Sequence, residues 1–290
     1  MISKAKDTEF SYKQSLQIRG KKLDLSKPLV MGILNITTDS FYSHSRVKSP
    51  EMWMEAARRM IAEGAAILDI GAVSSRPGAI AISEQDELER LIPVILELSA
   101  AFPEAILSVD TYRSSIAART VAAGAHIIND ISAGELDTKM FETIADLGVP
   151  YIMMHMKGTP GNMQDDPKYN NVVDDIKIYF EKRLEKLYRY RHVEVLLDPG
   201  FGFGKTLAHN YEILRRLYEF SSLGLPILAG LSRKSMICKV LDVSPGNALT
   251  GTGVLNTLAL LNGANILRVH DVREAMEAIK LVNAYNNKPV

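Results

Sequence analysis

The chain has 290 residues, 47% of them apolar, which suits one large α/β barrel or two smaller domains and supplies a substantial core. Its 34 basic and 34 acidic residues cancel, so the whole chain has no field that attracts nucleic acid or an anionic membrane. The single cysteine, Cys238, excludes an internal disulfide and a cysteine metal cluster.

The N-terminal segment is charged from Lys4 onward and has neither the apolar core nor the cleavage site of a secretory signal. No stretch approaches the roughly 18 apolar residues that a membrane span needs. We therefore expect a cytoplasmic protein that binds no membrane and no nucleic acid. Residues 1–25, with Tyr12 to Leu23 turning at Gly20, are expected to form a small hairpin that closes the bottom of a barrel.

Eight short apolar runs follow, and each stops at a polar residue. This pattern is typical of strands buried on both faces, as in a parallel sheet. In parallel α/β proteins the chemistry collects where the strands end, so the polar endings are candidate site residues. They are Asn35, Asp69, Asp110, Asn129, His155, Asp198, Ser232 and Arg268.

Segments with a helical period lie between the runs. Ser83 followed by Glu84-Gln85-Asp86 is typical of a helix start with Ser83 as the N-cap. The other expected helices are Pro50 to Ala62, Arg113 to Ala123, Thr138 to Leu147, Val172 to Tyr190, Asn210 to Phe220, Lys234 to Leu241, Asn247 to Leu261 and Val272 to Tyr285.

Eight strands alternating with helices favour one (β/α)8 TIM barrel, a single domain over residues 1–290 with the hairpin of residues 1–25 as its extension. An open, doubly wound sheet is the structural alternative. It is disfavoured because no Gly-x-Gly-x-x-Gly turn follows the first strand.

Asp110, Asn129 and Asp198 end three different strands that we expect to be buried. Burying an isolated carboxylate is unfavourable, so each needs a partner or a ligand. Two carboxylates and an amide that converge in one pocket suit the edge of a planar heterocycle rich in N–H groups. The alternative is that these side chains cap helices or bond neighbouring loops.

Asp198 also begins a glycine-rich loop that ends at Lys205. Its three glycines let the backbone approach a ligand closely or adopt a positive φ. Phe201 and Phe203 alternate with them and offer flat faces for stacking.

Two further strand ends are suited to anions. Hydroxyl and backbone N–H groups over Ser232 to Ser235 favour an anion such as a carboxylate, although a solvent-facing helix cap is the alternative. Arg268 and His270 share one face of the last strand, where barrels often bind phosphate. The polar loops 37–48 and 73–82 are candidates for lids.

Together these motifs resemble dihydropteroate synthase, in order, from about residue 29 to 272. The matching segments are Met31 to Asn35 with Asp39-Ser40-Phe41, Asp69-Ile70-Gly71 with Ser75-Arg76-Pro77-Gly78, Ser108 to Thr111, Ile128-Asn129-Asp130, Met154 to Gly158, Asp198 to Lys205, Ser232-Arg233-Lys234 and Arg268 to Asp271.

The resemblance implies a TIM barrel, usually dimeric, that makes 7,8-dihydropteroate for folate synthesis and is the target of sulfonamides. Its substrates are 6-hydroxymethyl-7,8-dihydropterin diphosphate and 4-aminobenzoate, and diphosphate leaves with the help of Mg²⁺. In this family the C–O bond breaks first, and the amine then attacks a pterin-methyl cation.

The resemblance also implies roles for individual residues, which group by the substrate that each would contact. The pterin is expected at Asp110, Asn129, Ile131, Met154, Asp198 and Lys234. The diphosphate is expected at Asn35, Arg76, Arg268 and His270, with Asn35 also a Mg²⁺ ligand. The 4-aminobenzoate is expected at Ser75, Pro77, Phe203, Lys234 and Ser235. The catalytic residues are then Asp110, Lys234, Arg268 and His270, and no role follows for Asp69 or His155.

The chain departs from the family pattern in the two loops. Thr38 stands where the family usually has proline, residues 42–46 lack the common Asp-Gly-Gly, and Gly71-Ala72-Val73-Ser74-Ser75 replaces the usual Gly-Gly-Glu-Ser-Thr. A pterin-binding paralogue without catalysis is therefore one alternative. A methyltetrahydrofolate:corrinoid methyltransferase is another, although it has no need for Ser232-Arg233-Lys234 or for the Arg268 and His270 pair.

Overall fold

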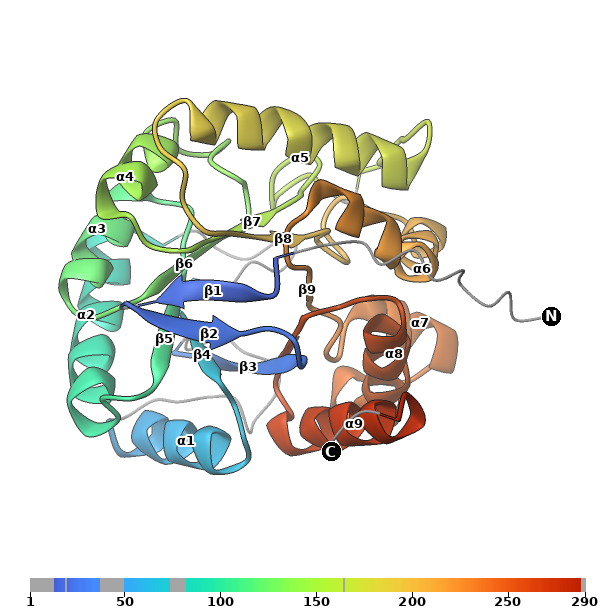
Figure 1. Ribbon diagram of the computed structural model, residues 1–290, viewed down its shortest axis with the longest axis horizontal. Coiled ribbons are helices and arrows are strands. Elements are labelled where there is room, and N and C mark those ends of the chain that lie inside the picture. The colour runs from blue at the N-terminus through green and yellow to red at the C-terminus, as the bar shows by residue number, and fades with distance from the viewer. Residues whose placement is uncertain (1–12, 19, 37–49, 74–81, 164, 288–290) are drawn as a thin grey trace.

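The computed structural model describes residues 13–18, 20–36, 50–73, 82–163 and 165–287 (Figure 1). The first element is an antiparallel hairpin of β1 (Ser15–Ile18) and β2 (Lys21–Asp24). It turns at Gly20, whose φ of +73° is a left-handed conformation that glycine adopts without steric cost. The predicted N-terminal hairpin is thus confirmed over β1 and β2, and residues 1–12 of that prediction lie outside the described residues.

Eight parallel strands then form a nearly closed barrel, which confirms the predicted fold class (Figure 1). They are β3 (Leu29–Asn35), β4 (Ile67–Gly71), β5 (Ile106–Asp110), β6 (Ile127–Asp130), β7 (Tyr151–Met154), β8 (Val195–Asp198), β9 (Leu228–Ala229) and β10 (Ile266–Val269). Neighbours pair in the order β8-β7-β6-β5-β4-β3-β10-β9. A parallel bridge between Leu197 and Ile227 brings the two ends of this order together.

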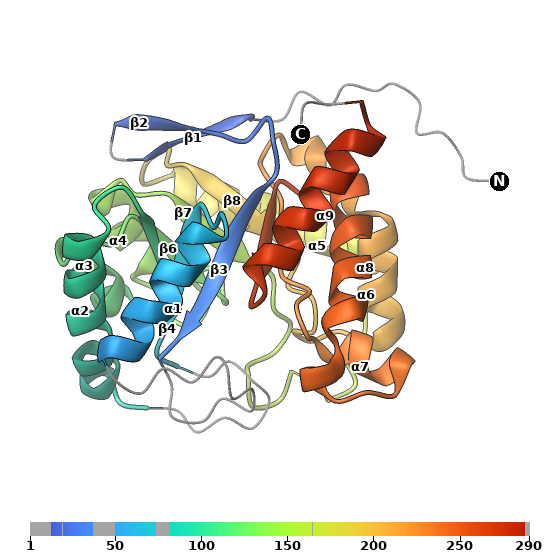
Figure 2. The ribbon, with the colours of Figure 1, turned by 90° about the horizontal axis from the view of Figure 1, so that it is seen from below.

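Helices connect consecutive strands and surround the barrel (Figure 2). They are α1 (Pro50–Ala62), α2 (Glu84–Ala101), α3 (Ser114–Ala122), α4 (Met140–Leu147), α5 (Val172–Tyr188), α6 (Leu207–Arg215), α7 (Ser235–Leu241), α8 (Leu249–Leu261) and α9 (Val272–Tyr285), with 3-10 turns at Leu217–Leu223 and Pro245–Asn247. Within the described residues, none of these helices has the length and apolar character needed to cross a membrane.

The helix boundaries follow local capping. Ser83 accepts a hydrogen bond from the backbone N–H of Asp86, as predicted for an N-cap. The expected helix at Asn210 to Phe220 is wrong in its bounds, because Thr206 caps an earlier start through the N–H of His209. His209 completes the capping box in place of the usual Glu or Gln, so the sequence signature did not reveal it.

Most buried apolar side chains belong to two clusters. The larger one lies between strands and helices. The smaller one fills the end of the barrel under the hairpin, where side chains from the N-terminal halves of seven strands meet Leu16, Ile18 and Leu25. This end is therefore closed by apolar packing, and the polar strand ends all lie at the opposite end.

Candidate active site

Arg268, from β10, lies at the centre of the site and binds two carboxylates. Its Nε is 2.6 Å from Oδ2 of Asp69 at β4, and its Nη2 is 2.9 Å from Oδ2 of Asp110 at the end of β5. The Asp69 side chain is fully buried, whereas the Arg268 and Asp110 side chains are 20% and 16% exposed. Asp110 and Arg268 therefore face an accessible space, and Asp69 lies beneath them.

The Asp110 carboxyl titrates far from its usual range. Burial raises the pKa of Asp110 to about 7; the Arg268 guanidinium opposes this rise, and the negative charge of Asp69 adds to it. A carboxyl with such a pKa changes its charge near neutral pH, which is a common property of active-site groups.

Asn129 and two apolar residues form the wall next to this ion pair. The side-chain Nδ2 of Asn129, on β6, donates a hydrogen bond of 3.0 Å to Oδ2 of Asp69. Ile131 and Met154 are buried in a small cluster with Met156 and Met163, and Tyr112 and Phe203 pack against it. A flat apolar wall beside a few convergent polar groups is typical of a site for a small planar ligand.

Asp198 and Lys234 form the second charged pair of the site. Oδ1 of Asp198 accepts a 2.7 Å hydrogen bond from the backbone N–H of Gly200. A methyl group built on Gly230 would lie 3.9 Å from Oδ2 of Asp198, 3.8 Å from Nζ of Lys234 and 4.0 Å from Cβ of Arg268. Gly230 therefore lies next to Asp198, Lys234 and Arg268.

Lys234 is shared between the carboxylate and the aromatic loop. Its ammonium donates to the carbonyl oxygen of Phe201 and lies 4.9 Å from the centre of the Phe203 ring. Burial lowers the pKa of Lys234 to about 8, and the negative charge of Asp198 opposes this effect. Burial in turn raises the pKa of Asp198, against the effect of the Lys234 cation.

The glycine-rich loop is fixed to the loop after β7 by a buried lysine. Nζ of Lys205 lies 2.9 Å from Nδ1 of His155 and donates to the carbonyl oxygens of His155 and Phe203. Burial lowers the pKa of both side chains well below their usual values, and the charge of Lys205 lowers the pKa of His155 further. The pair joins two walls of the site without reaching its accessible space.

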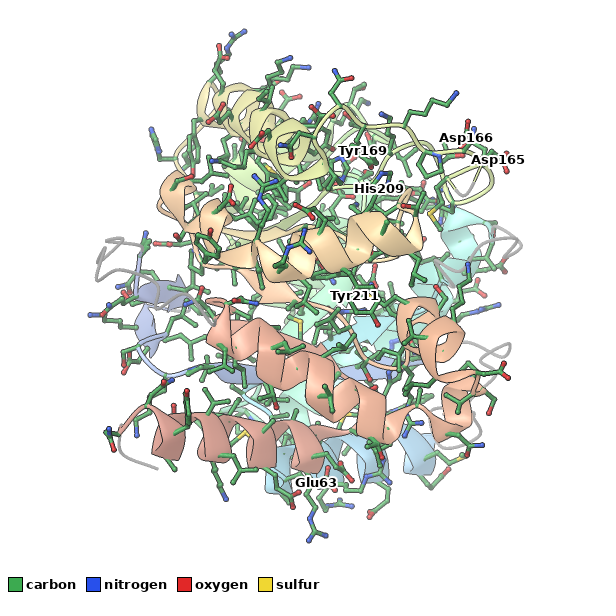
Figure 3. All side chains as sticks on the ribbon, turned by 90° about the vertical axis from the view of Figure 1, so that its right-hand side faces the viewer. Glu63, Asp165, Asp166, Tyr169, His209 and Tyr211 are labelled. Atoms are coloured by element: carbon green, nitrogen blue, oxygen red, sulfur yellow. The ribbon has the colours of Figure 1, made fainter. Side chains whose placement is uncertain are left out.

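Aromatic side chains shield this pair from solvent. The Tyr169 ring lies 6.1 Å from that of His155 and 5.0 Å from that of His209, and its hydroxyl donates to the carbonyl of Gly204 (Figure 3). A Cβ added at Gly200 would lie 2.0 Å from the carbonyl oxygen of His155, and one added at Gly204 would lie 2.3 Å from that of Lys157. The positive φ predicted for these glycines is confirmed at Gly200, Gly202 and Gly204. The close backbone approach at Gly200 and Gly204 is to the neighbouring loop.

His270 lies beyond the end of β10, beside Ser232. Nδ1 of His270 is 3.0 Å from the hydroxyl of Ser232, and the His270 backbone N–H donates to the same oxygen at 3.2 Å. Arg233, in contrast, forms two bonds to the Asp271 carboxylate at 2.8 and 2.9 Å and is buried. Ser235 is exposed as the first residue of α7, with Lys234 as its N-cap.

Asn35, at the end of β3, and Asp110 lie on either side of Gly71 of β4. A Cβ built on Gly71 would be 3.6 Å from Oδ1 of Asn35 and 3.9 Å from Oδ2 of Asp110. Among the described residues, no three His, Cys, Asp or Glu side chains gather as metal ligands. Mg²⁺ is commonly held by one or two protein oxygens together with substrate phosphates, so an amide oxygen beside a carboxylate fits that ion.

The predicted residues Ser75, Arg76 and Pro77 lie outside the described residues, as does Thr38. Of the altered segment after β4, Ala72 is buried and Val73 is partly buried. The remaining predicted residues come from seven different strands or the turns that follow them, and they lie at one end of the barrel.

Asp69, His155 and Lys205 had no role predicted from the sequence, yet each holds predicted site residues in place. The relevant signal was present for Asp69, because a charged residue inside a buried strand requires a partner. The pairing of β4 with β5 supplies one partner, because Asp69 lies opposite Ser108. Ser108 is two residues before Asp110 and on the same face of β5.

The chain is similar to known proteins over most of its length. Residues 31–270 match the model of a family described as pterin binding enzyme. The chain is 43% identical over 268 residues to the dihydropteroate synthase of Escherichia coli K12, covering 92% of this chain and 94% of that protein.

Solved structures of dihydropteroate synthases have the same fold. A Yersinia pestis dihydropteroate synthase in complex with a sulfonamide drug superposes with a TM-score of 0.90 at 42% identity, covering 94% of this chain and 99% of the other. A Xanthomonas albilineans dihydropteroate synthase with 4-aminobenzoic acid gives a TM-score of 0.86 at 38% identity, with 95% and 99% covered.

Proposed function

The chain belongs to the dihydropteroate synthase family, and from this premise we propose how its residues condense 6-hydroxymethyl-7,8-dihydropterin diphosphate with 4-aminobenzoate. The observation that supports the proposal best is the convergence of two carboxylates and two cations around Gly230. Arg268 bonds Asp110, and the charges of Asp198 and Lys234 stabilise each other. We place the pterin among these groups.

Each polar group then has a partner on the pterin. The carboxylates of Asp110 and Asp198 accept hydrogen bonds from the N–H groups of the ring, and the amide of Asn129 bonds its edge. Lys234 donates to a ring acceptor, while Ile131 and Met154 pack on the ring face. Phe203 and the exposed turn at Ser235 receive 4-aminobenzoate, together with Ser75 and Pro77.

The reaction begins with cleavage of the bond between the pterin methylene carbon and the diphosphate oxygen. The electron pair leaves with diphosphate, whose charge Arg268 and His270 stabilise, with Asn35 and Arg76 as further ligands. The Asp110 carboxylate stabilises the positive charge left on the pterin-methyl group. The amine of 4-aminobenzoate attacks this carbon, forms the new C–N bond and loses one proton.

We also propose Mg²⁺ as the metal, with Asn35 as its protein ligand. When bound, the ion neutralises charge on the diphosphate. The support for this proposal is the Asn35 amide oxygen, a hard donor of the kind that Mg²⁺ prefers, at the same end of the barrel as the Asp110–Arg268 pair.

A direct assay tests the assignment. Purified protein is incubated with the pterin diphosphate, 4-aminobenzoate and Mg²⁺, and both diphosphate and dihydropteroate are measured. Equal amounts of the two products are expected. Pterin binding without product would instead favour the non-catalytic paralogue, and methyl transfer from methyltetrahydrofolate to a corrinoid protein would favour the methyltransferase.

The pH dependence of kcat/KM should be bell-shaped, with limits at about pH 7 and about pH 8. Below the first limit Asp110 takes up a proton and no longer accepts from the pterin. Above the second, Lys234 loses its proton and its charge. We expect Lys234→Arg to remove the alkaline limit, because arginine stays protonated, while the acid limit remains. An acid limit at the ordinary pKa of aspartate would contradict the role of Asp110.

We propose a homodimer formed through α7 and α8, which lie together on one side of the barrel (Figure 2). Val254, Leu258 and Leu261 are 41–55% exposed and share one face of α8, and Val240 and Leu241 of α7 are also exposed. We also propose a cytoplasmic location, as expected from the sequence.

Light scattering tests this interface. Val254→Asp with Leu258→Asp should change the measured mass from that of two chains to that of one, because each charge would be buried at the dimer axis. Leu96→Asp, on the far side at α2, is the matched control and should remain dimeric, since Leu96 is similarly exposed. A double variant that keeps the mass of two chains would place the interface elsewhere.

A further inference from the structure

Asp69 is the most completely buried charged group of the site. It accepts hydrogen bonds from three side chains on three other strands. Its Oδ2 accepts from Nε of Arg268 at 2.6 Å and from Nδ2 of Asn129 at 3.0 Å. Its Oδ1 accepts from the hydroxyl of Ser108 at 2.6 Å. With 0% of its side chain exposed, Asp69 is inaccessible to a ligand in the space above it.

The contact with Asn129 determines which end of that amide faces the pterin. An ionised carboxylate only accepts hydrogen bonds, so the amide nitrogen of Asn129 must face Asp69. The amide oxygen is then left for an N–H group of the ligand. If the amide were reversed, two oxygens would meet in a buried place, and Asn129 would offer the pterin a donor where its ring also has donors.

The contact with Arg268 works in a similar way. Asp69 holds Nε, whereas Asp110 holds Nη2 at 2.9 Å. When Asp110 turns to the pterin, Arg268 keeps one fixed carboxylate partner and stays aimed at the diphosphate. The two aspartates therefore differ in function, although both bind the same guanidinium.

We propose that Asp69 is a positioning residue, which touches no substrate and sets both the amide of Asn129 and the guanidinium of Arg268 for the pterin diphosphate. The inference rests on the proposed function. It adds that one buried carboxylate makes the pterin half and the diphosphate half of the site depend on each other.

A double-mutant cycle between Asp69 and Asn129 tests the proposal, with 6-hydroxymethylpterin as the titrated ligand in calorimetry. Asp69→Ala and Asn129→Ala should each raise its Kd by about tenfold or more, and the double variant should be no worse than Asn129→Ala alone. Asp69→Ala should also lower kcat, because Arg268 loses its fixed partner. Additive effects on Kd, or a wild-type Kd in Asp69→Ala, would overturn the proposal.

A conservative variant keeps the test valid if Asp69→Ala does not fold. Oδ2 of Asp69 accepts from both Arg268 and Asn129, and Oδ1 accepts from the Ser108 hydroxyl. Asp69→Asn can keep an oxygen toward Arg268 and Asn129 and direct its amide nitrogen to Ser108, whose hydroxyl also accepts. This variant should therefore keep the pterin Kd within about threefold of the wild type and lower kcat, because Arg268 loses its charged partner. A pterin Kd as weak as that of Asn129→Ala would mean that Asp69 does not act by orienting residue 129.

Asp130→Asn is the control for a purely structural effect. Asp130 is buried on the same strand and bonds Tyr151, Ser132 and Gly134, all away from the pocket. It should lower thermal stability and leave the pterin Kd unchanged. Measurements on the wild-type protein separate the two proposals. If the wild type neither binds pterin nor forms product, the proposed function is refuted. If it does both, the variants alone decide whether Asp69 is a positioning residue.

Discussion

Lys234→Ala should lower kcat/KM by about 100-fold or more, as expected for a buried donor aimed at the reacting ligand. The ammonium lies between Asp198, the carbonyl of Phe201 and the ring of Phe203. Removing it leaves the Asp198 carboxylate buried, with the backbone N–H of Gly200 as its hydrogen-bond donor within the loop. The pKa of Asp198, already raised by burial, would rise further, because the Lys234 cation that opposes this rise is gone.

Two other lysine variants make this result specific. Lys239→Ala changes an exposed lysine of the same helix α7 and should leave kcat/KM unchanged. Lys234→Arg keeps the charge, but its planar fork does not replace a compact ammonium, so partial recovery is expected. Diphosphate release and pterin titration together measure the effect. A near-normal rate in Lys234→Ala would remove this residue from the site.

Arg268→Met should abolish measurable synthesis and also destabilise the fold. The change leaves Asp69 and Asp110 next to each other without the cation that now contacts both. Breaking a buried ion pair by removing one partner costs about 3–5 kcal/mol, so a clear shift in the urea midpoint is expected. Activity should fall more than about 1000-fold, because the departing diphosphate also loses its donor.

Arg273→Met is the matched control, since Arg273 lies on α9 with 74% of its side chain exposed. It should change neither stability nor rate. Arg268→Lys should recover stability in part and activity very little, because one ammonium cannot bond two carboxylates in the geometry of a guanidinium. Full activity in Arg268→Met would mean that diphosphate departs without help from β10.

The barrel followed from the sequence because its strands are buried on both faces and each stops at a polar residue. The bounds of α1 and α9 agree with the prediction, since clear apolar periods define them. The start of α6 did not follow, because a histidine takes the place of the usual acidic residue in its capping box. The period of apolar residues predicts which helix face is buried. Helix caps are predicted from sequence only where they use the common capping residues.

The sequence predicted which residues form the site, but not which of them bind one another. Strand ends indicated that Asp110, Asn129, Asp198 and Arg268 would converge, and they do lie at one end of the barrel. Their partners depend on distances between strands that are far apart in the chain. Nothing in the local sequence around Asp69 indicates that Arg268, 199 residues later, binds it.

The close backbone contact between the loops after β7 and β8 limits how this protein can evolve. At Gly200 and Gly204 any side chain would overlap the carbonyl oxygens of His155 and Lys157. Selection for resistance to an inhibitor that rests on this loop therefore has little freedom at these two positions.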